Sequence, residues 1–188
     1  MIDVARVAVL LLAAGRSERF GADKLLACID GIPIGLHAAG RLAALDPGWR
    51  IAICRQESPL IDSLRDLDFE IIVNGEPSKG LSSSLALGAK RAEAHGAQGL
   101  LIGLADMPFV GVRHLTSILS AFDARTAPIV ASEGNGIAMP PALFGSAYFR
   151  ELQQLSGDQG ARRLLADALR VATSPDELAD IDRPEDLR

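Results

Sequence analysis

The sequence predicts a three-layer α/β domain in which helices cover a mostly parallel β-sheet. Two apolar runs, Val7–Leu12 and Leu100–Ala105, have the continuous hydrophobicity of strands that are buried on both faces. Strand and helix patterns alternate between them, and this order implies parallel strands joined by right-handed crossovers. A chain of 188 residues is most simply one domain, residues 1–188, with a single core.

The alternation is clearest in the first half of the chain. The expected elements, in order, are a strand at Val7–Leu12, a helix at 34–45 begun by Pro33, a strand at Trp49–Cys54, a helix at Pro59–Leu67 with Ser58 as its N-cap, and a strand at Phe69–Val73. Three consecutive β-strands with two helices between them are typical of an open parallel sheet.

The second half continues the pattern with less regularity. The expected elements are a helix opened by Ser82–Ser84 and continuing to Ala92, a strand at Leu100–Ala105, a helix at Gly111–Phe122, a short strand at Pro128–Ala131, a helical pair over 141–168 that restarts at Asp158, and a helix start at Pro184 and Glu185.

Composition and charge give no sign of a nucleic-acid or membrane partner. Apolar residues make up 48% of the chain, charged residues make up 23%, and the net charge is −5. An acidic chain has no general attraction for nucleic acid or for anionic lipid. The run at Val7–Ala14 is too short to cross a membrane and no cleavable leader is recognisable, so we expect a cytoplasmic protein.

The loop after the first strand has the composition of an anion-binding loop. Small residues at Ala13–Gly15 let a ligand approach the backbone, and three cations follow within nine residues. The three cations are Arg16, Arg19 and Lys24, and Ser17 adds a hydroxyl between the two arginines. Loops at the carboxyl ends of parallel strands bind ligands in open α/β sheets, so we expect a triphosphate here rather than an ordinary loop with solvated arginines. Neither the P-loop motif nor the dinucleotide fingerprint is present.

A second polar stretch follows the third expected strand. Asn74 ends that strand, and Ser82, Ser83 and Ser84 open the next helix. Hydroxyls and free N–H groups at a helix start are donors for a ligand above the sheet edge. Simple capping of the helix needs one serine, whereas three allow capping together with ligand contact, and the residues themselves leave both interpretations open.

An acidic side chain stands at the tip of the second doubly buried strand. Asp106 follows Ala105, and Pro108 separates it from the next helix, so it is poorly placed to cap that helix. Mg²⁺ is usually held by one or two carboxylates together with substrate phosphates and waters, and Asp106 is therefore the candidate metal ligand.

The cysteines and histidines carry no readable chemistry. Cys28 and Cys54 lack metal-ligand spacing and are expected on core elements as small hydrophobes. His37, His95 and His114 have no partner at metal or triad spacing, so we expect structural or solvent-facing roles.

Four segments resemble nucleotidyltransferases that modify the molybdenum cofactor, and the cytidylyltransferase branch in particular. They are L-A-A-G-x-S-x-R-F-G-x-x-K at Leu12–Lys24, G-L-S-S-S-L at Gly80–Leu85, A-D-M-P at Ala105–Pro108, and L-A-D-I-D-R-P-E-D-L at 178–187. S-G-D-x-G-A-R at Ser156–Arg162 is also similar, although a helix–turn–helix corner without chemistry is the preferred interpretation of it. The A-A-G at Ala13–Gly15 and the three serines favour the cytidylyl over the guanylyl branch by resemblance alone.

The resemblance implies the nucleotidyltransferase variant of the Rossmann-like fold and a magnesium-dependent transfer of CMP from CTP to the phosphate of the molybdopterin cofactor. The implied catalytic residues are Arg16, Lys24 and Asp106, and the implied metal ligands are Asp106 and Asp182, although Asp180 and Asp182 are equally read as a solvated acidic end. The implied nucleotide-binding residues are Leu12, Ala13, Ala14, Gly15, Arg16, Ser17, Arg19, Lys24, Asn74, Ser82, Ser83 and Ser84. E-G-N-G-I-A-M-P-P-A-L-F at Glu133–Phe144 resembles the family segment that borders the acceptor pocket, and Asn135 is carried over from it as an acceptor-binding residue. A client molybdoenzyme is a possible partner.

Departures from the family pattern keep two alternatives open. Ala105, Gly136 and Arg183 replace a glycine, a proline and a threonine of the pattern. One alternative is a nucleotidyltransferase that acts on another small phosphorylated acceptor, such as an enzyme that uses GTP or one that acts on a sugar phosphate. The other is a non-catalytic accessory protein that binds the cofactor and passes it to a molybdoenzyme.

Overall fold

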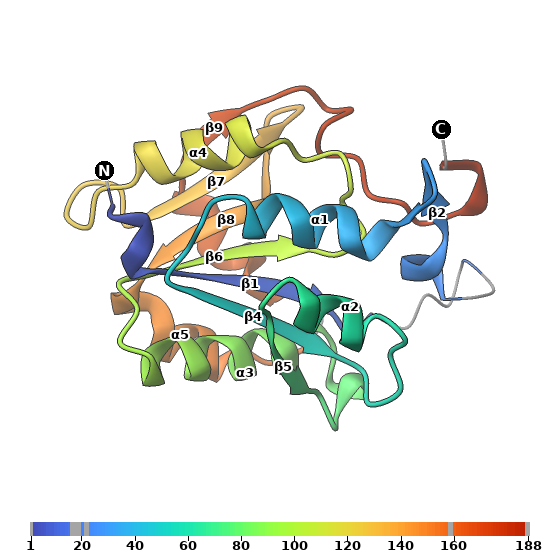
Figure 1. The fold of residues 1–188 in the computed structure, drawn as a ribbon. Coiled ribbons are helices and arrows are strands. Elements are labelled where there is room, and N and C mark those ends of the chain that lie inside the picture. Colours follow the sequence, from blue (N-terminus) through green and yellow to red (C-terminus); the bar gives the residue numbers. More distant parts are fainter. Residues whose placement is uncertain (1, 16–19, 21–22, 158–159, 187–188) are drawn as a thin grey trace.

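A single seven-stranded sheet organises the chain in the computed structural model, which describes residues 2–15, 20, 23–157 and 160–186. Its strands are β1 (Val7–Ala13), β4 (Trp49–Cys54), β5 (Glu70–Val73), β6 (Gly99–Leu104), β7 (Ile129–Gly134), β8 (Ile137–Gly145) and β9 (Leu169–Ala172). They lie side by side in the order β5-β4-β1-β6-β8-β7-β9. The first strand of the sequence, β1, thus sits inside the sheet with β4 and β6 as its neighbours (Figure 1).

Parallel pairing dominates the half of the sheet around β1. Strand β1 pairs in parallel with β4 and β6, and β4 pairs in parallel with β5. Strand β8 runs antiparallel to both β6 and β7, and β9 returns to a parallel pairing with β7. The carboxyl ends of β1, β4 and β6 therefore meet at one edge of the sheet, at the right in Figure 1.

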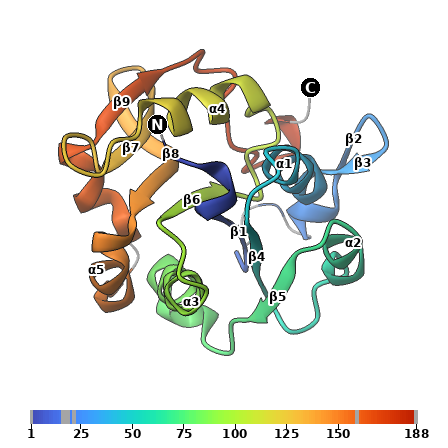
Figure 2. The same cartoon turned by 60° about the vertical axis from the view of Figure 1, so that its left-hand side comes forward.

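Helices cover both faces of the sheet and complete three layers. One face carries α1 (Ile34–Ala43), α2 (Ile61–Asp66) and α4 (Val112–Ala121), and the other carries α3 (Leu81–Ala94), α5 (Phe149–Gln154) and the 3₁₀ segment η5 (Gly160–Asp167) (Figures 1 and 2). This arrangement confirms the expected three-layer α/β architecture with a mostly parallel sheet.

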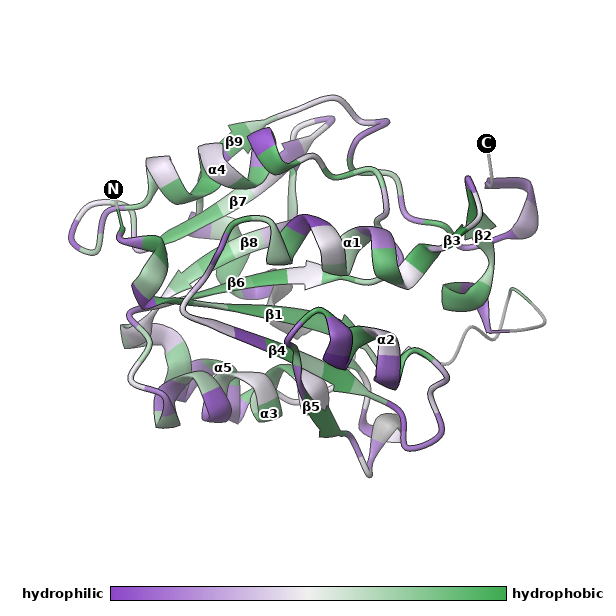
Figure 3. Cartoon of the chain, viewed as in Figure 1, coloured by the Kyte–Doolittle hydropathy of each residue, from purple (hydrophilic) through white to green (hydrophobic). Residues whose placement is uncertain are grey.

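The core explains why the first strand reads as an unbroken apolar run. Val9 and Leu11 face the cluster under α1, α2 and α4, whereas Leu10 and Leu12 face the cluster under α3 and α5. Alternate side chains of a strand point to opposite faces, so a strand with helices on both sides must be apolar throughout. Strand β1 is accordingly drawn in the green of hydrophobic residues in Figure 3.

Smaller elements gather at the carboxyl edge of the sheet. The hairpin of β2 (Cys28–Ile29) and β3 (Ile32–Pro33) lies there, next to the 3₁₀ turn η2 (Lys24–Leu26) and to the C-terminal segment with η6 (Pro184–Asp186) (Figure 1). The remaining short 3₁₀ turns are η1 (Val4–Arg6), η3 (Pro77–Lys79) and η4 (Ser146–Tyr148).

Several local predictions were wrong. Residues 141–145 are not helical but belong to β8, and only α5 and η5 remain of the expected helical pair; β9 was not predicted. Helix α2 begins at Ile61, after Leu60, and has no side-chain cap, so Ser58 is not its N-cap. Cys28 is exposed rather than in the core, whereas Cys54 is buried, and both thiols are free. The restart at Asp158 lies outside the described residues.

A search of the helices in the described part of the chain finds none long and apolar enough to span a membrane.

Candidate functional site

Three charged side chains from distant parts of the chain meet at the carboxyl edge of the sheet. The Nζ atom of Lys24 lies 2.8 Å from Oδ2 of Asp106 and 2.9 Å from Oδ1 of Asp182. Lys24 opens η2, Asp106 follows β6, and Asp182 precedes η6. The structure therefore brings together the cation and the two carboxylates that the sequence singled out.

Backbone hydrogen bonds fix the two carboxylates beside the lysine. The N–H of Ala105 donates to the carbonyl of Leu12, which continues the β1–β6 pairing up to Asp106. The N–H of Ile181 donates to the carbonyl of Asp106 at 2.9 Å, which attaches the C-terminal segment to the same point. Ala105, which stands where the family pattern has a glycine, is buried.

Lys24 is held in place by its neighbours in the chain. Asp23 caps η2 by accepting a hydrogen bond from the N–H of Leu25, and Leu25 itself is buried in the core. The guanidinium of Arg55, at the end of β4, bonds to the other oxygen of the Asp23 carboxylate. Lys24 is only 8% exposed, so its ammonium depends on acidic partners for stabilisation.

The charges of the site shift the titration of its members. Burial lowers the pKa of Lys24, but hydrogen bonds and charges from Asp106 and Asp182 outweigh burial, so the pKa lies above the usual 10.5. Burial, followed by repulsion from Asp182, raises the pKa of Asp180 above its usual 3.8. Within the described part of the chain, this edge is thus an acidic site in which the buried Lys24 ammonium lies between two carboxylates.

The donor set fits a hard divalent cation that completes its shell from a substrate. Asp106 and Asp182 already converge on one positive charge, and carboxylate oxygens are the ligands that Mg²⁺ and Mn²⁺ prefer. Among the described residues no group of three or more acidic, histidine or cysteine side chains forms a complete metal cage. A site of two carboxylates matches a metal that arrives with phosphates and keeps several waters.

The described part of the predicted phosphate loop offers backbone rather than side chains. Leu12, Ala13 and Ala14 are buried, and Gly15 is exposed with open space where a side chain would stand. Arg16, Ser17 and Arg19 lie outside the described residues, so their predicted contacts with a triphosphate stay predictions.

The predicted serine donors are engaged with the loop before their helix. Asn74 donates through its amide to the hydroxyls of Ser83 and Ser84 at 2.8 and 2.9 Å. The hydroxyl of Ser82 donates to the carbonyl of Lys79. Helix α3 has no side-chain cap, because Gly80 with φ 79° occupies the N-cap position. The serines therefore tie the loop to α3, and their contact with a nucleotide stays a prediction.

An apolar cavity of about 420 Å³ adjoins the charged site. Leu12 and Asp180 line it on the side of the charged cluster, and Asn135 lines it at the turn between β7 and β8. Most of the remaining wall is aliphatic or aromatic and comes mainly from β6, β8 and α3: Leu81, Leu85, Ile102, Leu104, Met107, Ile137, Ala138, Met139, Pro140, Ala142, Phe144 and Leu165. The structure thus places Asn135 beside a ligand-sized space rather than beside Lys24.

Two residues of the site were missed by sequence reasoning, namely Asp23 and Arg55, which bond to each other across 32 positions. Asp180 was considered as part of the acidic end, but its place at the cavity was not predicted. The position of Arg55 directly after an apolar strand that pairs with β1 was an available signal, because loops at that edge meet.

Comparison with known proteins assigns this arrangement to a family. The model of the MobA-like NTP transferase domain matches residues 9–173. The chain belongs to this family. The protein is therefore a nucleotidyltransferase enzyme. Of the charged site, Lys24 and Asp106 lie within the matched region and Asp182 lies beyond it.

Curated relatives agree with the family over most of the chain. The purine catabolism protein PucB of Bacillus subtilis is 31% identical over 191 residues, covering 94% of this MobA-like chain and 92% of the relative. A probable molybdenum cofactor guanylyltransferase of Pyrococcus horikoshii is 32% identical over 166 residues, covering 85% of this chain and 79% of the relative.

Solved structures share the fold. Rv0371c of Mycobacterium tuberculosis superposes with a TM-score of 0.78 at 20% identity, covering 98% of this MobA-like chain and 96% of that chain. A structure of Rv0371C in complex with manganese superposes with a TM-score of 0.66 at 19% identity, covering 89% and 88% of the two chains. This likeness confirms the Rossmann-like nucleotidyltransferase fold.

Proposed function

We propose that the protein transfers a nucleotidyl group from a nucleoside triphosphate to the phosphate of the molybdenum–molybdopterin cofactor and releases pyrophosphate. The observation that carries the proposal is the meeting of Lys24, Asp106 and Asp182 at the carboxyl ends of β1 and β6. The acceptor class is supported by molybdenum cofactor guanylyltransferases among the relatives, including the protein of Pyrococcus horikoshii. The whole chain, residues 1–188, acts as one nucleotidyltransferase domain.

The reaction needs alignment and charge neutralisation more than covalent help. A phosphate oxygen of the acceptor forms a bond to the α-phosphorus, and the bond from that phosphorus to the bridging oxygen of pyrophosphate breaks. Lys24, with Arg16 and Arg19 from the preceding loop, binds the phosphates and takes up the negative charge that builds on the departing pyrophosphate. Leu12–Gly15, Ser17, Asn74 and the serines at 82–84 frame the nucleotide.

Asp106 and Asp182 hold the divalent cation, for which we propose Mg²⁺. The bound cation supplies positive charge that neutralises the triphosphate oxygens. The support is the pair of carboxylates on one buried ammonium, together with the manganese complex of the structural relative Rv0371C. The role of Asp106 and Asp182 is to keep the cation at the edge of the sheet where β1 and β6 end.

The nucleotide has two candidates. CTP is our proposal, because A-A-G at Ala13–Gly15 and G-L-S-S-S-L at Gly80–Leu85 resemble the cytidylyl branch. GTP is the second candidate, because the curated relatives whose names specify a nucleotidyl group are guanylyltransferases. A direct comparison of the two triphosphates under identical conditions decides between them.

The apolar cavity supports a flat heterocyclic acceptor. A ligand pocket that is largely apolar with a few polar groups suits a ring system with exchangeable N–H and carbonyl groups. Asn135 and Asp180 are the polar members of the wall that face such groups, and both border the cavity. We propose that the pterin part of the acceptor occupies this space and that a client molybdoenzyme receives the product.

The test is pyrophosphate release with a panel of substrates. Purified protein with Mg²⁺ is given CTP or GTP, with molybdopterin cofactor or a sugar phosphate as acceptor. We expect release with CTP and the cofactor, and loss of about 10²–10³ in rate for Asp106→Asn. Asp62→Asn, at an exposed surface aspartate on α2, is the matched control and should keep full activity.

Each other outcome has a definite meaning. Turnover with GTP but not with CTP would show that GTP is the nucleotide substrate. Turnover only with a sugar phosphate would show that the acceptor is not the molybdopterin cofactor. Equal rates for the wild type and Asp106→Asn contradict the proposed metal site. Tight cofactor binding without turnover on any nucleotide contradicts transfer as the function.

A further inference from the structure

Arg55 stands at the base of the loop that leads to Lys24. Strand β4 pairs with β1 so that Cys54 is the partner of Ala13, and Arg55 and Ala14 each follow directly. Asp106 leaves the sheet on the other side of β1, because β6 is the opposite neighbour of that strand (Figure 1). The carboxyl end of β1 therefore lies between the strand end that leads to Arg55 and the strand end that leads to Asp106.

A hydrogen-bonded relay connects Arg55 to the turn that carries Lys24. The Nη2 atom of Arg55 donates to Oδ2 of Asp23, and Oδ1 of Asp23 accepts the N–H of Leu25 at 3.3 Å. The side chains of Asp23 and Arg55 are 16% and 33% exposed. One carboxylate thus links β4 to the first turn of η2, and Lys24 is the residue between its two anchors.

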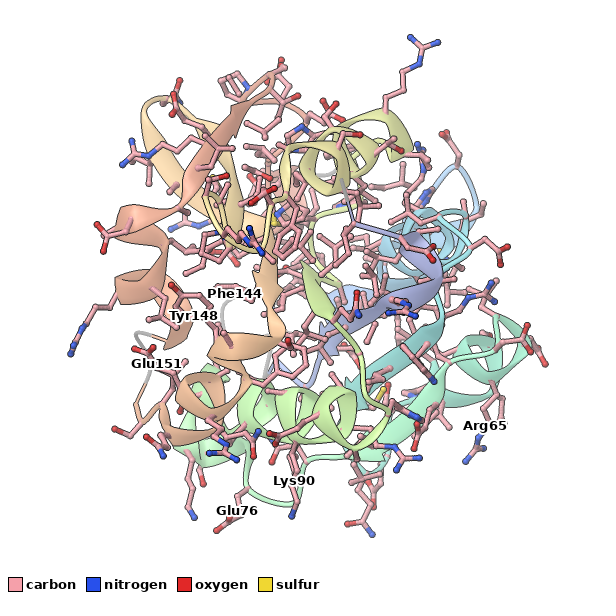
Figure 4. All side chains as sticks on the ribbon, turned by 90° about the vertical axis from the view of Figure 1, so that its left-hand side faces the viewer. Arg65, Glu76, Lys90, Phe144, Tyr148 and Glu151 are labelled. Carbon is pink, nitrogen blue, oxygen red and sulfur yellow. The ribbon has the colours of Figure 1, made fainter. Side chains whose placement is uncertain are left out.

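The Arg55–Asp23 pair differs from the ordinary surface pairs of this protein. Arg65 and Asp62 form an ion pair within one helix, with side chains 62% and 91% exposed, and Arg65 projects outward in Figure 4. Exposed ion pairs of that kind contribute little to the stability of the folded protein. Arg55 instead reaches across 32 residues, and its Nε atom is buried without a partner among the described residues. Because an unpaired buried donor is unfavourable, the contact with Asp23 is the interaction that compensates this placement.

We propose that Arg55 is a positioning residue of the nucleotidyl-transfer site. Through Asp23 it holds the η2 turn so that the Lys24 ammonium meets Asp106 and Asp182. The importance of that ammonium for catalysis rests on the proposed function, but its placement by Arg55 does not. The inference therefore has one test that needs no turnover and a second that does.

The first test uses the fact that the chain has three lysines, Lys24, Lys79 and Lys90. Acylation with an amine-reactive ester, read by mass spectrometry, reports the accessibility of each. In the wild type, Lys24 is buried between two carboxylates and should react slowly, whereas Lys79 is a surface residue and Lys90 lies on the outer face of α3 (Figure 4). Arg55→Met should raise labelling of Lys24 about tenfold and leave Lys79 and Lys90 unchanged.

Two further variants isolate the relay from a general loss of structure. Asp23→Asn keeps a side chain that caps a helix start well but removes the charge that Arg55 contacts, so it should expose Lys24 as Arg55→Met does. Arg65→Met is the matched control, because it breaks a surface arginine–aspartate pair and should leave Lys24 protected. Unchanged protection of Lys24 in folded Arg55→Met or Asp23→Asn protein overturns the proposal.

The second test is kinetic and separates positioning from direct substrate contact. Arg55→Met should lower kcat about 10–100-fold, since small misplacements of a catalytic group have effects of that size, and Arg55→Lys should restore part of it. In the Lys24→Met background, Arg55→Met should have no further effect on kcat. A further drop there would show that Arg55 touches the phosphates itself and would overturn the positioning role. Absence of any transfer by the wild type would refute the proposed function, whereas the labelling result would still decide the inference.

Discussion

The Nζ atom of Lys24 lies 2.8 Å from the Oδ2 atom of Asp106, although the two residues are 82 positions apart in the sequence. The same nitrogen lies 2.9 Å from Asp182, so one ammonium stands between two carboxylates. Such an ammonium stabilises two neighbouring acids that would otherwise repel each other. It also occupies the space between the groups that we propose as metal ligands, which gives a prediction about metal affinity.

Replacing Lys24 by methionine should have opposite effects on turnover and on metal binding. Transfer should fall by about 10²–10³, because a charge that stabilises the departing pyrophosphate is lost. Binding of Mn²⁺ without nucleotide should tighten by roughly tenfold, because Asp106 and Asp182 lose their internal cation. Electron paramagnetic resonance of free Mn²⁺ measures the second effect without any assay of activity.

Lys90→Met provides the control for this experiment. Lys90 is an exposed lysine on α3, so its loss removes the same charge from the chain at a distance from the two carboxylates. Both Mn²⁺ affinity and turnover should stay at wild-type values. If Lys24→Met binds Mn²⁺ no better than Lys90→Met, the two carboxylates do not form the metal site.

The strands nearest the site could be predicted from sequence because helices cover both of their faces and make their sequences continuously apolar. The expected strand at Trp49–Cys54 coincides with β4, and the run from Val7 differs from β1 by one residue. A strand covered by helices on both faces is apolar at every position, and this signal is local. Residues 141–145 were expected in a helix, but they form part of β8, which pairs with β6 and β7. A short apolar run does not distinguish a strand from a helix, and only its partners decide.

The site was predictable where a residue type and a strand end coincide. Lys24 and Asp106 follow the two apolar strands that turn out to be neighbours, so their meeting follows from the topology. The position of Arg55 after an apolar strand was a signal that was not used, and it does not show that Arg55 reaches Asp23. Asp180 was considered as part of the acidic end, but nothing in the chain indicates that it borders a cavity. Those contacts depend on loop conformation, which side-chain type alone does not specify.

Asp180→Asn should stabilise the protein at neutral pH. Burial first, and then the charges of Asp182 and Asp106, raise the pKa of Asp180, so the folded state holds its proton more tightly than the unfolded state does. The ionised carboxylate is therefore unfavourable above the raised pKa, and this penalty disappears as the pH falls through the raised value toward 3.8. Urea denaturation should show the variant to be more stable than the wild type at pH 7 and equal to it at the acid end. An equal difference at both pH values would contradict the assignment.

Gly48→Ala and Gly40→Ala should change stability in opposite directions. A Cβ atom on Gly48 would stand 2.1 Å from the carbonyl oxygen of Ala5, a backbone atom that has no side-chain freedom to move away. The substitution should lower the free energy of unfolding by roughly 1–3 kcal/mol. Gly40 lies within α1, and nothing lies within 4 Å of the place that a Cβ atom would take there, so alanine should raise the free energy of unfolding by about 0.5–1 kcal/mol. Chemical denaturation of the two variants tests the pair, and a neutral Gly48→Ala would contradict the close approach of Gly48, just before β4, to η1.

Filling the apolar cavity should affect the acceptor and spare the nucleotide. Ala138 on β8 lines the cavity, so leucine there takes space that we assign to the ring of the acceptor. The KM for the acceptor should rise by about tenfold, as expected for the loss of a few favourable contacts, while the KM for the nucleoside triphosphate stays within about twofold. The two effects should separate because Lys24 and Asp106, which we propose to act on the triphosphate, do not line the cavity, and Leu12 is the residue that the two proposed sites share. Ala172→Leu, at an exposed alanine of β9, should change neither constant and controls for the added bulk. A rise in the nucleotide KM with an unchanged acceptor KM would place the base, rather than the acceptor, in this cavity.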